Sequence, residues 1–297
     1  MKAGGALVVA ETQANRISQV SSSGVVTLVA GSATGSSGSA NGTGQAALFS
    51  APTGVAVDAS GNIFVADQNN HLIRKITSTG VVSTFAGNGA PGFRDATGTQ
   101  AGFKFPVDVA LDSAGNLYVA DGGNNRIRKI TPAGVVTTLA GTGAAGSTDG
   151  PGASATFNVP TGVAVDSTGR VFVAETSGDR IRLIDTSGQV STYAGTGVSG
   201  SLDASTATQA TFASPYHLAV DASENVFVAD TGNNLIRQIT PGGVVSTYAG
   251  VRNPSNAVVN GPALSATFNA PYGVVVDTNG YAYVADRGHN LLRLIVP

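Results

Sequence analysis

The sequence lacks cysteine and tryptophan, and it has only three histidines and one methionine among 297 residues. The absence of cysteine excludes disulfides, thiolate metal sites and a cysteine nucleophile, so an oxidising and a reducing compartment suit the chain equally well. Charged residues are also scarce, at 11 %. The polar surface must therefore consist mostly of Ser, Thr, Asn, Gln and Gly. Because such surfaces are common in secreted and cell-surface bacterial chains, we expect an extracellular, cell-surface or periplasmic location.

The chain also lacks a strong charge imbalance and a long apolar run. Its formal net charge is −2, and a surface without excess basic charge attracts phosphate backbones weakly, so we expect no nucleic-acid partner. No apolar run approaches the roughly 20 residues that cross a bilayer, so we expect no membrane insertion. The apolar residues Ala6 to Ala10 are too few for a signal peptide and are followed at once by Glu11.

The sequence is rich in one feature, an internal repeat. The string Val-Ala-Asp or Val-Ala-Glu occurs six times, at intervals of 54 to 56 residues. Its acidic residues are Glu11, Asp67, Asp121, Glu175, Asp230 and Asp286. A second string, Gly-Val-Ala-Val-Asp or a close variant, keeps the same step and ends at Asp58, Asp112, Asp166, Asp221 and Asp277. Two independent markers with one period indicate tandem structural units.

Each repeat contains four short segments with the composition of β-strands. In the second repeat they cover residues 54–58, 63–67, 72–76 and 81–86, each rich in Val, Ile, Phe or Thr and bounded by turn-forming residues. No segment has a sustained helical period, so we place no helices. Four consecutive antiparallel strands form one blade of a propeller. We therefore predict an all-β, six-bladed β-propeller of four-stranded antiparallel blades in a single domain, with repeats near residues 1–50, 51–104, 105–158, 159–213, 214–269 and 270–297.

The first and last repeats are incomplete. Alignment of the repeats places Met1 at the position of Val57 and Pro297 at the position of Pro241. The first blade therefore lacks its first strand and the last blade lacks its fourth, which leaves 22 strands in all. We expect a trimmed fragment of a longer chain, or an engineered propeller, and a partner segment that completes the terminal blades.

The repeat resembles a known family. The stretch from Pro52 to Ile76 is similar to the NHL repeat, and the same pattern recurs from Pro106, Pro160, Pro215 and Pro271. Residues 138–143 and 155–162 resemble in particular the long-looped bacterial variety. The resemblance implies a six-bladed propeller. Relatives of this architecture include peptide- and RNA-binding modules, a zinc-dependent lyase and calcium-dependent hydrolases, so membership alone does not fix a function.

Most polar motifs are repeated, and repetition favours a structural role. Asp67 and Arg74 lie across neighbouring strands, so we expect one carboxylate–guanidinium pair in each blade. Asp58 opens a tight turn with the pattern Asp-x-x-Gly-Asn. The Gly-x-Gly-x-x-Gly strings lie in loops and are not followed by a helix, so we assign no nucleotide or other cofactor. We interpret the recurring polar residues of the long loops as turn formers, namely Asn41, Asp95, Asp149, Asp203 and Asn260.

The sequence contains no defensible catalytic set. His71, His217 and His289 lie in three different repeats, whereas a zinc site built from imidazoles needs about three that converge. No Gly-x-Ser-x-Gly elbow is present. We therefore assign no catalytic residue and no metal ligand, and we lean against an enzyme.

The breaks in the repeat are the candidate ligand-binding residues: Asp108, Tyr216, His217 and Tyr272. They occur where most repeats have small residues at the start of the first strand, on the face that collects the long loops. The alternative interpretation is that they simply fill the mouth of the propeller channel. Three functions stay open: a non-enzymatic module that binds a protein, peptide or glycan on the long-loop face, a small-molecule hydrolase or lyase, and a structural or engineered propeller without a ligand.

Overall fold

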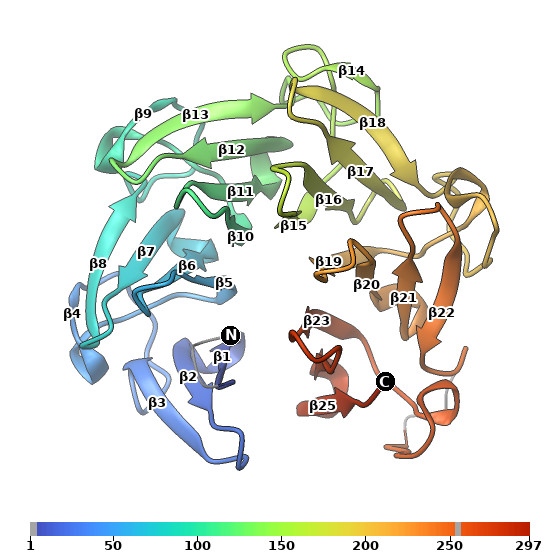
Figure 1. The fold of residues 1–297 in the computed structure, drawn as a ribbon. Helices are drawn as coiled ribbons and strands as arrows, with labels where there is room; N and C mark the ends of the chain where they lie inside the picture. The colour runs from blue at the N-terminus through green and yellow to red at the C-terminus, as the bar shows by residue number, and fades with distance from the viewer. Residues whose placement is uncertain (1–4, 253–256) are drawn as a thin grey trace. The chain divides into compact units, whose positions relative to one another are not determined.

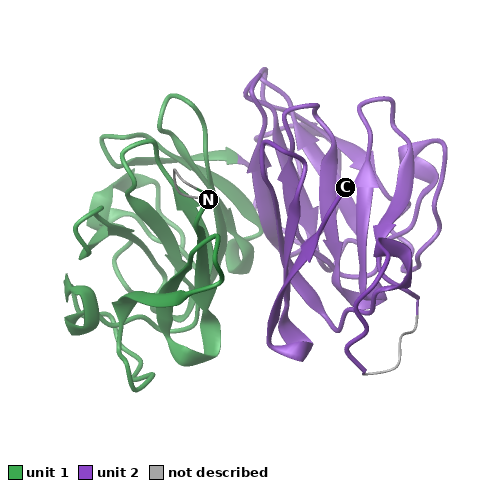
Figure 2. Ribbon diagram, turned by 60° about the horizontal axis from the view of Figure 1, so that its bottom comes forward, with its two compact units in different colours: residues 1–139 green, residues 140–297 purple. Residues whose placement is uncertain are grey.

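The computed structural model describes residues 5–252 and 257–297 (Figure 1). The chain divides into two compact units, residues 1–139 and 140–297, and each unit contains three antiparallel sheets (Figure 2). The fold is the predicted all-β, six-bladed propeller. In the part of the chain that the structure describes, the only helical segments are single 3-10 turns of three residues. The predicted alignment of Met1 lies outside the described residues.

Unit 1 holds the first three blades. The first sheet is β1-β2-β3, the second is β4-β8-β7-β6-β5 and the third is β10-β11-β12-β13-β9. The strands are β1 (Leu7–Glu11), β2 (Arg16–Val20), β3 (Val26–Gly31), β4 (Gly42–Thr43), β5 (Pro52–Val57), β6 (Ile63–Asp67), β7 (Leu72–Ile76), β8 (Val81–Ala86), β9 (Ala96–Thr97), β10 (Pro106–Leu111), β11 (Leu117–Asp121), β12 (Arg126–Ile130) and β13 (Val135–Ala140).

Unit 2 holds the last three blades. Its sheets are β14-β18-β17-β16-β15, β19-β20-β21-β22 and β23-β24-β25. The strands are β14 (Gly150–Pro151), β15 (Pro160–Val165), β16 (Val171–Glu175), β17 (Arg180–Ile184), β18 (Gln189–Ala194), β19 (Pro215–Val220), β20 (Val226–Asp230), β21 (Leu235–Ile239), β22 (Val245–Ala249), β23 (Pro271–Val276), β24 (Ala282–Asp286) and β25 (Leu291–Ile295).

The incomplete terminal blades are confirmed, because the first and last sheets have three strands each. Three of the complete blades carry a fifth, very short strand in addition to the four predicted. There the long connection that precedes the blade turns back and adds a two-residue strand beside the fourth strand, so that Gly42 pairs with Val82 and Gly150 pairs with Val190. Such short pairing covers an edge that would otherwise expose unpaired backbone groups.

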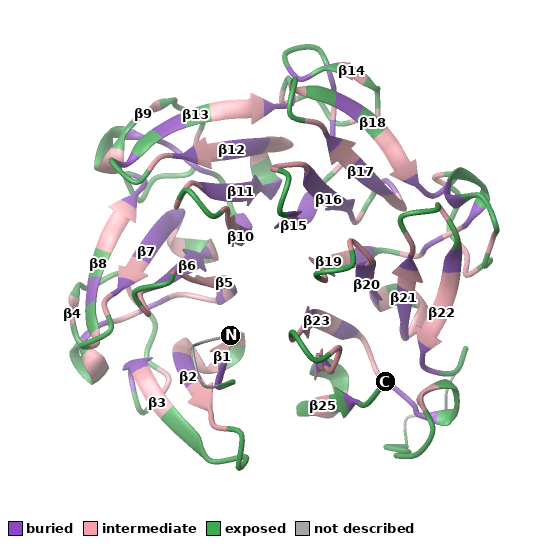
Figure 3. Ribbon diagram, viewed as in Figure 1, coloured by how far each residue is buried: buried purple, intermediate pink, exposed green. Residues whose placement is uncertain are grey.

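The core lies between successive blades within each unit. The second strands β6, β11, β16 and β20 are buried along their whole length (Figure 3). In unit 2, Phe212 from the connection between β18 and β19 joins Phe172 of β16 and Val226 of β20 in one apolar cluster. Each blade thus covers a face of its neighbour, which explains why both faces of a strand carry apolar side chains.

Candidate functional site

A buried ion pair at the end of the second strand is repeated in five blades. Arg74 donates from Nη1 to Asp67 Oδ2 over 2.8 Å, and both side chains are fully buried. The same guanidinium also donates to the carbonyl oxygens of Leu48 and Ala40 in the long connection. The equivalent pairs are Asp121–Arg128, Glu175–Arg182, Asp230–Arg237 and Asp286–Arg293. The predicted charge pairs are therefore confirmed in five blades, where they anchor the long loops. In the first blade Ser18 stands at the position of the arginine, and Glu11 pairs with Arg16 instead.

The polar residues of the long loops have a different role from the one predicted. Asp149 and Asp203 each accept a hydrogen bond from Nη2 of the blade's arginine, at 2.6 and 2.5 Å. Asn260 accepts one from Arg293 in the same way at 2.8 Å. These residues are second partners of the arginines and do not merely form turns.

Burial raises the pKa of four of the paired carboxyls, those of Asp67, Asp121, Glu175 and Asp230. It raises the pKa of Asp230 to about 6, although hydrogen bonds from Asn233, the Ala213 amide and Arg237 act in the opposite direction. The pKa values of Asp67, Asp121 and Glu175 are raised for the same first cause. Each of these carboxyls already accepts several hydrogen bonds from within the protein. We therefore assign them a structural role in the blades and do not count them among the candidate ligand-binding residues.

A second repeated contact links successive blades within each unit. Asn234 ends the turn after β20 in the left-handed conformation, and its Oδ1 accepts a hydrogen bond from the amide of Ala270 at 2.7 Å. In unit 1, His71 replaces the asparagine, and its Nδ1 accepts from the amide of Phe105 at 3.1 Å. Burial, followed by the charge of Lys104, lowers the pKa of His71. His71 is therefore a structural residue, and the contact sets where each first strand begins.

The third residue of the first strand alternates between glycine and a larger residue: Gly54, Asp108, Gly162, His217 and Gly273. A Cβ on Gly54 would lie 2.5 Å from the Cα of Asp108, and one on Gly162 would lie 2.9 Å from the Cα of His217. Real side chains do not approach this closely. Each large residue in these pairs is therefore accommodated by the glycine of the preceding blade.

The structure brings three of the four candidate residues together, all in unit 2. The rings of Tyr216 on β19 and Tyr272 on β23 stack with centroids 4.2 Å apart and planes at 23°. His217 lies next to Tyr216, and its Nδ1 accepts from the amide of Val274 at 3.4 Å. The fourth candidate, Asp108, belongs to unit 1, where it lies on β10 with 2 % of its surface exposed.

Arg287 is a site residue that the sequence analysis missed. It lies in the turn after β24 and is exposed. Its Nη1 donates to the Tyr272 hydroxyl at 2.9 Å, and its guanidinium carbon lies 4.3 Å from the centroid of the Tyr272 ring. The signal was present, because the other repeats have Thr, Gln or Gly directly after the acidic residue. We call Tyr216, Tyr272 and Arg287 the tyrosine patch.

The remaining ionisable groups do not converge. Within residues 5–252 and 257–297, no group of three or more His, Cys, Asp or Glu side chains is arranged to hold a metal ion. His289 is engaged with Asp286, its Nδ1 lying 2.9 Å from Oδ2. The same part of the chain has no helix with the length and apolar character needed to cross a membrane.

Comparison with known proteins shows what two of the repeats are similar to. The family model of the NHL repeat matches residues 49–76 and 103–130. The chain is 28 % identical over 281 residues to NHL repeat-containing protein 2 of Homo sapiens, covering 83 % of this chain and 38 % of that protein. It is 32 % identical over 154 residues to Protein SUPPRESSOR OF QUENCHING 1, chloroplastic, of Arabidopsis thaliana, covering 48 % and 15 %. The chain thus spans well under half the length of these relatives.

Solved structures share the fold at low sequence identity. An auxiliary nutrient binding protein from Bacteroides ovatus is 17 % identical with a TM-score of 0.69, covering 96 % of this chain and 64 % of that one. A virginiamycin B lyase from Staphylococcus aureus, solved with Quinupristin, is 17 % identical with a TM-score of 0.60, covering 100 % and 78 %. Such similarity establishes architecture and leaves function to the site.

Proposed function

We propose that this chain, whose propeller blades are built from NHL repeats, is a non-enzymatic binding module for a protein, peptide or glycan partner on its long-loop face. The observation that supports this proposal is the tyrosine patch. Tyrosine and arginine are the residue types that most often carry the energy of protein interfaces. Tyrosine offers a large rigid surface at little cost in conformational entropy.

The geometry of the patch favours a peptide segment with a carboxylate next to an aromatic or proline ring. The stacked rings of Tyr216 and Tyr272 provide an apolar, polarisable surface on which a flat group can lie. Arg287 is oriented by its bond to the Tyr272 hydroxyl, and a guanidinium has further donors that suit a carboxylate. A sugar ring would use the same surface, so a glycan is the second partner class. Because the patch has a single arginine, it does not favour a nucleic-acid partner. We also propose an extracellular or cell-surface location.

The test compares which ligands the original protein and two matched variants select from the same libraries. Phage-displayed random peptides and an immobilised oligosaccharide array are probed with the original protein, with Tyr272→Ala and with Tyr281→Ala. Tyr281 is the control because it lies in the turn between β23 and β24 of the same blade. We expect selected ligands to be lost with Tyr272→Ala and retained with Tyr281→Ala. Equal binding by both variants, or no selection above background, would overturn the proposal.

The two other functions have different signatures in this experiment. A small-molecule hydrolase or lyase that uses His217 would release product from a substrate library, and His217→Ala would abolish the release. A propeller without a ligand would select nothing from either library. The similarity to virginiamycin B lyase concerns the fold alone and favours neither outcome.

A further inference from the structure

The loops of the third blade depart from the repeat at three positions outside the tyrosine patch. Phe93 takes the place of a serine, Lys104 that of an uncharged residue and Phe105 that of a smaller one. The equivalence is set by the backbone, because the carboxylate that ends each second strand accepts a hydrogen bond from the amide at the position of Lys104. The residues at these positions in the second, fourth and fifth blades are Ser39, Ser50 and Ala51, Ser147, Asn158 and Val159, and Ser201, Ala213 and Ser214.

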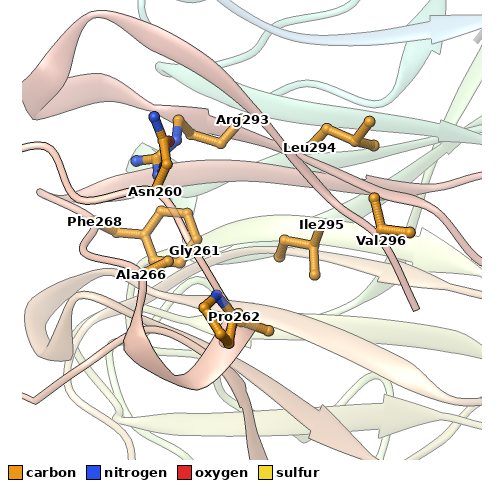
Figure 4. A pocket seen from close by; sticks show the side chains of 11 residues that line it. Asn260, Gly261, Pro262, Ala266, Phe268, Arg293, Leu294, Ile295 and Val296 are labelled. Carbon is orange, nitrogen blue, oxygen red and sulfur yellow. Dashed lines mark hydrogen bonds between the residues drawn. The ribbon is translucent and has the colours of Figure 1, made fainter.

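The third blade otherwise keeps the framework of the other blades. Figure 4 shows this framework in the last blade, where Arg293 lies beside Asn260 and Phe268. In the third blade Arg128 has the corresponding two partners. The framework is therefore complete without Phe93, whose ring is an addition to it.

Phe93 lies on the guanidinium groups of two arginines. It belongs to the connection between β8 and β9, and its ring centroid is 3.8 Å from the guanidinium carbon of Arg126 and 4.8 Å from that of Arg128. Such contacts orient both the ring and the cations. Because 45 % of the Phe93 surface is exposed, the ring is not part of the core.

Phe105 is held in a conformation that large side chains rarely adopt. Its φ is 49°, in the left-handed region, where other blades place small residues such as Ala51 and Ala270. Its ring packs edge-on against His71 with centroids 4.6 Å apart, and 41 % of its surface is exposed. Strain at an exposed aromatic residue is typical of a functional position.

The turn after β11 contacts both loops that carry these rings. The stem of Lys104 lies over Gly123, since a Cβ on that glycine would be 2.8 Å from the Lys104 Cγ. Arg126 donates from Nη1 to the carbonyl oxygen of Asn124 at 3.3 Å. The Nδ2 of Asn124 donates to the carbonyl oxygen of the residue before Phe93 at 2.8 Å. The two rings and the two cationic side chains therefore surround one turn.

The surface around the two rings is positively charged. Residues 92–95, 102–105 and 121–128 contain four arginine or lysine side chains and two carboxylates, and both carboxylates are bound to Arg128. The equivalent segments of the fourth blade have more carboxylates than cations, namely Arg180, Arg182, Asp149, Glu175 and Asp179. We call the following residues the phenylalanine patch: Phe93, Arg94, Lys104, Phe105 and Arg126.

We propose that the phenylalanine patch binds an acidic segment of a partner protein that carries a large apolar side chain beside its Asp or Glu residues. The carboxylates of the segment pair with Arg94 and Lys104, and its apolar side chain packs on the exposed surface of the two rings. Single-stranded nucleic acid fits less well, because it needs a basic groove that follows several phosphates, whereas these cations surround one turn. The patch belongs to unit 1 and the tyrosine patch to unit 2, so this proposal does not depend on the ligand of the tyrosine patch.

The test begins with phage-displayed random peptides that are selected on the original protein at low ionic strength. We expect a class of peptides that is rich in Asp and Glu and contains Trp, Phe or Leu. One synthetic, labelled member is then titrated with the protein at increasing NaCl concentrations. Its affinity should fall as the salt rises, because the ion pairs form at exposed side chains. With this peptide bound, hydrogen exchange should slow in residues 92–95 and 122–126.

Three variants locate the site, and each introduces a residue that other blades carry at the same position. Phe93→Ser and Phe105→Ala should each weaken peptide binding at least about tenfold, because each removes an apolar contact. Lys104→Asn should weaken it about fivefold at low salt and less at high salt. Lys75→Gln is the control, because it removes one positive charge from β7, where Lys75 packs on Phe64, and it should leave the affinity unchanged. Thermal unfolding checks that all four proteins are folded.

Tyr272→Ala separates this proposal from the proposed function. This variant should bind the acidic peptide as tightly as the original protein does. If the selection yields peptides that require Phe93 and no ligand that requires Tyr272, the proposed function fails and this proposal stands.

Three results would overturn the proposal. The first is a selection without an acidic, apolar class of peptides. The second is unchanged affinity in both Phe93→Ser and Phe105→Ala, or an equal loss in Lys75→Gln. The third is tighter binding of a labelled single-stranded oligothymidylate that the same variants abolish, since the partner would then be a nucleic acid.

Discussion

Gly54 and Asp108 occupy equivalent positions in neighbouring blades, and the backbone of Asp108 lies where a side chain on Gly54 would have to be. The same relationship joins Gly162 to His217. The breaks in the repeat are thus not isolated substitutions. Each large residue is compatible with the fold because the equivalent residue of the preceding blade is a glycine, which has no side chain.

This relationship predicts unequal costs for one substitution at two equivalent sites. Gly54→Ala should lower the free energy of unfolding by about 1–3 kcal/mol, because the new methyl group overlaps the Asp108 backbone. Gly273→Ala should cost less than about 1 kcal/mol, since its Cβ would meet only Ala285 at 3.4 Å. Urea denaturation of both variants measures the difference. Equal effects would contradict the steric explanation.

The buried pair of Asp230 and Arg237 gives a second prediction. Asp230→Asn removes the buried counter-charge of Arg237 and leaves only the partly exposed Asp203 as its ionic partner, so it should lower the free energy of unfolding by about 3–5 kcal/mol. The control is Glu224→Gln, which removes the partly exposed pair with Arg170 and should change stability by less than about 1 kcal/mol. Chemical denaturation at neutral pH compares the two. If Asp230→Asn changed the free energy of unfolding by less than about 1 kcal/mol, the pair would not be an important contribution to the stability of the blade.

His71 predicts a specific dependence of stability on pH. Because its pKa is lowered in the folded state, the unfolded chain binds a proton more readily. The free energy of unfolding should therefore be greatest above the unfolded pKa, near 6.5, and should fall as the pH drops below it. Protonation of Nδ1 also removes the acceptor for the Phe105 amide.

His71→Asn is the matched variant, because Asn15 and Asn234 make the same contact in other blades. It should keep the stability near pH 7.5 and lose less of it on acidification to about pH 5 than the original protein does. Denaturation at both pH values gives the comparison, with His217 and His289 present in both proteins. If the His71→Asn protein had the same pH dependence of the free energy of unfolding as the original protein, His71 would not be the cause of that dependence.

Burial predicts a contrast between two equivalent aliphatic residues. Ile236→Ala should lower the free energy of unfolding by about 2–5 kcal/mol, because it leaves a cavity in the apolar cluster between the last two blades. Leu292→Ala removes an exposed side chain and should cost less than about 1 kcal/mol. If Leu292→Ala were as costly as Ile236→Ala, the face of the last sheet that carries Leu292 would be covered in solution.

The candidate site could be predicted only in part. Tyr216, His217 and Tyr272 stood out because they interrupt a regular pattern, and the structure places them together in unit 2. Their binding role stays a prediction, as does that of Asp108. Arg287 was overlooked because arginine is common in the repeat, and its contact with Tyr272 spans two strands of the blade. The pairing of glycines with large residues was also missed, since it joins residues about one repeat apart.

The sequence by itself determined the blades. Alternating apolar residues, tight-turn signals and the acidic and arginine positions are local and recur in five or six repeats, so they predicted the strands, the missing terminal strands and the buried ion pairs. Only the tertiary structure decided how the long connections are used. They add the short strands β4, β9 and β14 and place hydrogen-bond acceptors beside the arginines. These features depend on backbone pairing and packing between segments that are far apart in the chain, and no local pattern of residues encodes them.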